Sequence, residues 1–66
     1  MTGYELRRAR LRMDLEQKEL AELLGMRANT ISRYEIGAMT IPNYVELAVK
    51  YLELMEAKRS ETIKPE

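Results

Sequence analysis

The sequence predicts an all-α fold of four to five short helices, and three observations support this prediction. Apolar residues recur at the three- and four-residue spacing of amphipathic helices over most of the chain. Gly25 and Gly37 interrupt this periodicity, and Pro42 precedes its last stretch. The chain has 66 residues, 45% hydrophobic and 33% charged, which is typical of one small folded domain. We therefore expect one domain over residues 1–59 and a flexible tail over residues 60–66.

The chain contains no cysteine and no histidine, which narrows the function classes. It therefore lacks a disulfide framework, a thiolate nucleophile, the usual general base and the commonest metal ligand. We expect neither an enzyme nor a metal, cofactor or small-molecule site. The apolar runs are short and interrupted by charges, so we also expect no membrane span and a cytoplasmic location.

Basic and acidic residues balance, with 11 of each and a net charge of zero, but they are unevenly distributed. Residues 1–13 contain four arginines and one acid, and residues 26–34 contain two arginines and no acid. The acids cluster elsewhere: Glu16, Glu19, Glu22, Glu46, Glu53, Glu56, Glu61 and Glu66. This distribution leaves cationic surface on one side of the molecule.

The first helix should begin at a capping box. The Thr2 hydroxyl can accept a hydrogen bond from the Glu5 amide, and the Glu5 carboxylate can accept one from the Thr2 amide. Asp14 is expected to close this helix. Its inward positions are Leu6, Ala9, Arg10 and Met13.

Residues 17–36 predict two short helices joined by a tight corner. The first spans Gln17 to Leu24 with Glu16 as its N-cap, and Gly25 ends it because glycine adopts the left-handed conformation without steric cost. The next spans about Ala28 to Glu35. The inward residues are Leu20, Ala21, Leu24, Met26, Ile31 and Tyr34, and the outward residues of the later helix are Ala28, Asn29, Thr30, Ser32 and Arg33.

The outward residues suit the major groove of DNA. Asn can pair with adenine, Arg with guanine, and the methyl groups of Thr or Ala can contact thymine. The helix, glycine, helix pattern is equally typical of any helical hairpin, so this periodicity alone leaves both interpretations open.

The last helix is predicted from about Asn43 to Lys58, with Pro42 in its first turn. Its apolar residues cover an arc of roughly 220°, about twice what packing on one small domain requires. The surplus face therefore predicts a two-fold homodimer, unless the wide arc simply wraps around a core short of apolar residues. The predicted dimer face is Leu47, Tyr51, Leu54 and Lys58.

Over about residues 4–55 the chain resembles the Cro/C1-type (XRE-like) helix-turn-helix repressors of phages and bacteria. The resemblance rests on an ordered set of residues rather than on any one of them. The set is Leu6, Arg10, Leu15, Gln17, Leu20-Ala21, Leu24-Gly25, Ile31-Ser32-Arg33-Tyr34-Glu35, Gly37 and Pro42. It implies a lambda-repressor-like helical bundle with its helix-turn-helix at residues 17–36.

The resemblance also implies roles for individual residues. Gln17 resembles the glutamine that binds a DNA phosphate, and Arg10 and Glu35 match an ion pair in which Arg10 can also face a phosphate. Asn43 matches a backbone-contacting position. The base-reading positions are Ala28, Asn29 and Arg33, and the flanking positions are Arg27, Thr30 and Ser32.

Three features of the sequence depart from the family pattern. Arg27 stands where a Ser or Thr usually caps the recognition helix, and Ala28 replaces a polar base reader. No helix breaker follows the fourth helix, so the family's fourth and fifth helices can be fused here, which would change the dimer geometry.

These observations predict a homodimer that binds double-stranded DNA at a palindromic site and represses transcription. The alternative, of a different class, is a protein-interaction module, such as an antitoxin-like or co-regulator subunit, that uses the apolar face of its last helix. An enzyme would need Lys or Tyr chemistry for which the sequence shows no arrangement.

Overall fold

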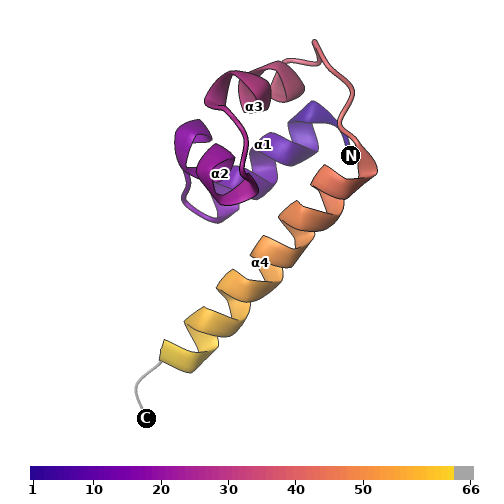
Figure 1. Cartoon of the computed structure of the whole chain (residues 1–66). Helices are drawn as coiled ribbons and strands as arrows, with labels where there is room; N and C mark the ends of the chain where they lie inside the picture. Colours follow the sequence, from indigo (N-terminus) through magenta and orange to yellow (C-terminus); the bar gives the residue numbers. More distant parts are fainter. Residues whose placement is uncertain (64–66) are drawn as a thin grey trace.

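The computed structural model describes the backbone of residues 1–63 and the side chains of residues 1–55, and this part of the chain contains four helices. Figure 1 shows three short helices gathered into a head and a long fourth helix that extends away from it. The molecule is accordingly elongated, with extents of 45 × 19 × 19 Å. The helices are α1 (Gly3–Arg12), α2 (Gln17–Leu24), α3 (Ala28–Glu35) and α4 (Asn43–Ile63). The all-α prediction is confirmed.

The three helices of the head all end in the same way. Each is followed by a residue with a left-handed backbone, namely Asp14 (φ 59°), Gly25 (φ 72°) and Gly37 (φ 81°). In each case the next amide donates back to a carbonyl in the last turn, the hydrogen-bond pattern of a Schellman motif. These bonds are Leu15 N to Arg10 O at 3.1 Å, Met26 N to Ala21 O at 2.9 Å and Ala38 N to Arg33 O at 2.9 Å. Each motif ends its helix sharply, so three short helices fit into one small head.

The start of α1 has the predicted capping box. The Glu5 amide donates to Thr2 Oγ1 at 3.1 Å, and the Thr2 amide donates to Glu5 Oε1 at 2.8 Å. Gly3 follows at the first helical position, where an added Cβ would lie 2.5 Å from the Glu35 carbonyl oxygen and closer still to that of Tyr34. Only glycine therefore lets the start of α1 approach the end of α3 this closely.

The core draws side chains from all four helices. Leu20 and Ala21 of α2 pack against Ile31 and Tyr34 of α3, as the periodicity predicted. Leu24 is half-buried at the rim of the same cluster. Within residues 1–55 the buried apolar residues are Leu6, Ala9, Leu20, Ala21, Ile31, Tyr34, Ile41, Val45 and Val49. Because α4 supplies two of these nine and the preceding loop one, the head depends on α4 for its core.

The last helix is longer than the sequence predicted. It continues to Ile63 instead of ending at Lys58, so residues 60–63 of the predicted tail are helical, and residues 64–66 lie outside the described residues. The prediction relied on the polar composition near Arg59, but polar residues do not end a helix without a breaker, and Pro65 is the first one available. Through Ile63 the fourth helix is continuous, with no separate fifth helix.

Among the helices described here, none combines the length with the apolar composition that crossing a lipid bilayer requires.

Candidate nucleic-acid interface

The outer face of α3 presents polar side chains on a short, well-anchored helix. Asn29 and Arg33 are both exposed and lie four residues apart, so their side chains are neighbours on one face. The opposite face carries Ile31 and Tyr34, which are buried in the core. Burial of one face fixes the rotation of α3 and directs Asn29 and Arg33 away from the head.

The flanks of α3 hold four more of the residues to which the sequence assigned DNA contacts. Ala28 is half-buried and packs against the core, which leaves it less surface for a base than Asn29 has. Thr30 and Ser32 are also half-buried. Arg27 is exposed and stands at the N-cap with no side-chain hydrogen bond to the helix, so its guanidinium is not used in capping.

Ile36, which the sequence analysis assigned no role, lies on the same outer face. It directly follows Glu35, the last residue of α3, and 75% of it is exposed. At about 100° per residue, Asn29, Arg33 and Ile36 fall within an arc of about 60°. The helical periodicity of α3, when it is extended one residue past the end of the helix, places Ile36 on this face.

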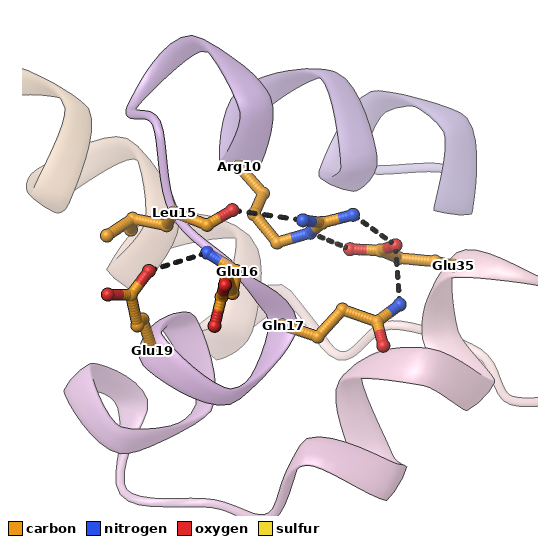
Figure 2. Close-up of polar contacts among 6 residues, drawn as sticks. All are labelled: Arg10, Leu15, Glu16, Gln17, Glu19 and Glu35. Carbon is orange, nitrogen blue, oxygen red and sulfur yellow. Dashed lines mark hydrogen bonds and ion pairs between the residues drawn. The ribbon is translucent and has the colours of Figure 1, made fainter.

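A buried ion pair ties α1 to the end of α3. Arg10 Nε donates to Glu35 Oε2 at 2.7 Å, and Arg10 Nη2 donates to Glu35 Oε1 at 3.1 Å. Arg10 Nη1 also donates to the Leu15 carbonyl at 3.0 Å, so the same guanidinium fixes the corner between α1 and α2. Figure 2 shows this guanidinium between its two partners. The side chains of Arg10 and Glu35 are only 11% and 5% exposed, which favours the structural role of Arg10 over a phosphate contact.

Gln17 completes this network from the first position of α2. Its Nε2 donates to Glu35 Oε1 at 3.0 Å, and the side chain is half-buried (Figure 2). An amide nitrogen carries two hydrogens, so one N–H of Gln17 is used by Glu35 and the other is available to a ligand. Helices α1, α2 and α3 therefore meet at one carboxylate.

The N-terminus of α2 carries negative as well as positive potential. The Glu16 amide donates to Glu19 Oε1 at 2.8 Å, which places the Glu19 carboxylate beside the first turn (Figure 2). The helix dipole attracts anions to this end, but two exposed glutamates oppose a phosphate there. Asn43 offers a second helix N-terminus, because it is exposed and is the first residue of α4.

The outer face of α4 is apolar. Four side chains between 55% and 69% exposed lie at spacings of three, four and three residues, on the side opposite the buried Val45 and Val49. These four, Tyr44, Leu47, Tyr51 and Leu54, define the outer seam of α4. Three of them belong to the predicted dimer face, Tyr44 is an addition, and the side chain of Lys58 lies outside the described residues.

The charged residues of α4 whose side chains the structure describes, Glu46, Lys50 and Glu53, lie on a different flank. Glu46 accepts from the Met1 ammonium at 3.2 Å and from Lys50 at 3.3 Å, and Glu53 pairs with Arg12 at 2.7 Å. The ammonium and the lysine hold the pKa of the Glu46 carboxyl below its ordinary value, mainly through these hydrogen bonds. The outer seam is therefore left without charged side chains among its four members.

Within the part of the chain that the structure describes, no three acidic side chains converge closely enough to hold a metal ion. The helix-turn-helix family model matches residues 6–55, which covers α1 from Leu6 onward, all of α2 and α3, and the part of α4 that packs on the head. Neither the curated proteins nor the solved structures gave a significant match. On the family match, this chain is a member of the Cro/C1-type helix-turn-helix family of DNA-binding transcriptional regulators.

Proposed function

We propose that this protein is a repressor that binds a palindromic duplex DNA site as a homodimer, with the outer face of α3 in the major groove. The proposal rests on Asn29 and Arg33, which lie together on the exposed face of α3, while the opposite face of this helix is buried. A major groove admits one α-helix, and these two side chains can form bidentate hydrogen bonds with adenine and guanine.

Phosphate contacts would set the register of the protein on the duplex. Arg27 is exposed beside the start of α3, and Asn43 is exposed at the start of α4. Gln17 keeps one amide N–H for a phosphate while the other holds Glu35. We assign Arg10 to the fold rather than to DNA, because its guanidinium is buried against Glu35 and Leu15.

The homodimer is supported by the outer seam of α4. Four apolar side chains in line, each more than half exposed, favour association with a second apolar surface. A copy of the same seam is the simplest partner, because a two-fold axis brings identical surfaces together. Such a dimer would place two recognition helices on half-sites one helical turn apart, about 34–36 Å.

The same seam favours the second candidate function. A different protein with a complementary apolar face could occupy it, making this chain a co-regulator or antitoxin-like subunit in which DNA contact is secondary. The two candidate functions predict different masses for the purified protein. A homodimer forms from this chain alone, whereas the complex of the second candidate requires a different protein.

The test is a selection of bound duplexes from a random pool, followed by anisotropy titrations on the selected site. Arg33→Ala should cost about 1–3 kcal/mol on that site and relax the preference at one base pair. Arg7→Ala is the matched control, because Arg7 is an exposed arginine on α1 and not on α3. Equal losses for both variants, or an unchanged profile for Arg33→Ala, would remove Arg33 from base readout.

Two further measurements test the rest of the proposal. Affinity should fall steeply with salt, because phosphate contacts release counterions. A reporter gene whose promoter overlaps the selected site should be expressed less when the protein is present, and higher expression would make the protein an activator.

A further inference from the structure

We infer that Ile36 reads a thymine methyl group in the major groove and is a specificity-determining residue of the DNA site. The inference rests on the proposed function, since it requires α3 to enter the groove. It adds a contact of a different chemical kind, apolar rather than hydrogen-bonded, at a residue that follows the end of the recognition helix.

Ile36 lies seven residues after Asn29 and three after Arg33, which continues the exposed stripe of α3 by one more turn. Its amide donates to the Ser32 carbonyl at 3.1 Å, which keeps Ile36 on the last turn of the helix, and its backbone leaves the helical conformation only at this residue, with φ −89° and ψ 1°. A side chain in line with Asn29 and Arg33 faces whatever surface those two residues face.

Among the large hydrophobic residues whose side chains the structure describes, Ile36 is the most exposed, at 75%. It belongs neither to the core cluster nor to the partly buried residues that pack against it. Its branched side chain therefore gains by leaving water when a ligand covers it. Ala28, the other apolar candidate on α3, is already half-buried against the core.

Among the features that base pairs expose in the major groove, the C5 methyl of thymine is the apolar one, and the others are hydrogen-bond donors or acceptors. An isoleucine that meets a donor or acceptor would remove it from water without a partner, which is costly. Contact with a thymine methyl avoids this cost, so Ile36 should favour A·T at one position.

The geometry also locates the base pair. Seven residues of helix span about 10 Å, and successive bases are about 3.4 Å apart. The thymine should therefore lie within about three base pairs of the base that Asn29 contacts, and once in each half-site of a palindrome.

The experiment replaces each thymine of the selected duplex in turn by deoxyuridine, which differs only in lacking the methyl group. With the wild-type protein, one thymine per half-site should cost about fourfold in affinity, the expected value of one buried methyl-sized group. With Ile36→Ala the same replacement should cost nothing, and affinity for the unmodified duplex should already be lower. Leu11→Ala is the matched control, because Leu11 is an exposed aliphatic residue on α1 and should keep the wild-type uridine profile.

Each other outcome decides against the inference. A uridine penalty of equal size in the wild type and in Ile36→Ala would assign the methyl contact to another residue. A uniform loss of affinity in Ile36→Ala, with an unchanged uridine profile, would place Ile36 against the DNA backbone. If Ile36→Ala binds as the wild type does, Ile36 makes no contact with DNA. Failure of the wild type to prefer any duplex would overturn the proposed function, and the role of Ile36 with it. Circular dichroism of the variant checks that its helices are intact.

Discussion

The outer face of α3 and the outer seam of α4 are both exposed, and they differ in the kind of surface that can cover them. On α3, two side chains able to form directional hydrogen bonds, Asn29 and Arg33, stand beside one apolar residue, Ile36. On α4, four apolar or aromatic side chains follow one another without a charge among them. The first surface suits a ligand with ordered donors and acceptors, and the second suits another apolar surface.

The two faces also differ in how they are held. The C-terminal end of α3 is fixed by the Arg10–Glu35 ion pair, by Gln17 and by the close approach of Gly3. By contrast, α4 contacts the head through its first half and then extends beyond it (Figure 1). A base-reading surface needs fixed geometry, whereas an apolar seam can gain its order from the partner that covers it.

The largest expected effect comes from breaking the outer seam of α4. Leu54→Asp places a charge at the C-terminal end of the outer seam and should give a monomer that keeps its helices. Affinity for a palindromic site should then fall by about 10²–10⁴-fold, because the second half-site no longer binds as part of the same molecule. Sedimentation equilibrium measures the mass, and anisotropy measures the affinity.

Leu11→Asp is the control for that variant, since Leu11 is 52% exposed against 55% for Leu54 and lies on α1. It should keep the wild-type mass and affinity. If Leu54→Asp also keeps the wild-type mass, the dimer contact lies elsewhere on the molecule.

A second change removes the support of α3 and leaves its outer face intact. Arg10→Ala strands the Glu35 carboxylate in a buried position and should lower the free energy of unfolding by about 3–5 kcal/mol. Urea denaturation measures this free energy of unfolding. Arg8→Ala is the control, because Arg8 is exposed and donates a hydrogen bond of 2.9 Å to Tyr4 on its own helix. Similar losses for both variants would show that the pair with Glu35 contributes little.

The smallest effect concerns the contact between the N-terminus and α4. The pKa of Glu46 is lowered in the folded protein by the Met1 ammonium and by Lys50, so the stability it contributes is complete above its unfolded pKa. That stability is lost as the pH falls through the lowered folded pKa. Wild type should therefore melt at a higher temperature than Glu46→Gln at pH 7, and the difference should shrink at low pH. A difference independent of pH would mean that the carboxylate charge is not responsible.

The sequence predicted the head well because its signals there are local. Helical periodicity placed Leu20, Ala21 and Ile31 in the core, and Gly25 and Gly37 marked two of the three left-handed corners. Asp14 makes the third corner, where a short polar side chain tolerates the left-handed backbone that glycine usually supplies.

What the sequence did not reveal depends on contacts between distant residues or on the course of the chain after a helix. Gln17 was assigned to a phosphate, and its bond to Glu35 depends on the packing of α2 against α3. The exposure of Tyr44 depends on which face of α4 meets the head. Ile36 was overlooked because periodicity was counted only within helices, and α4 was predicted too short because polar residues were taken as its end.

The central claim is that the outer face of α3 reads DNA while the outer seam of α4 joins two copies. The most direct test is the mass of the complex between the wild-type protein and a selected palindromic duplex, measured by native mass spectrometry. Two chains per duplex should appear together, without a populated complex of one, and Leu54→Asp should give the single-chain complex instead. A wild-type complex with one chain per duplex, or a number of chains that grows with duplex length, would contradict the claim.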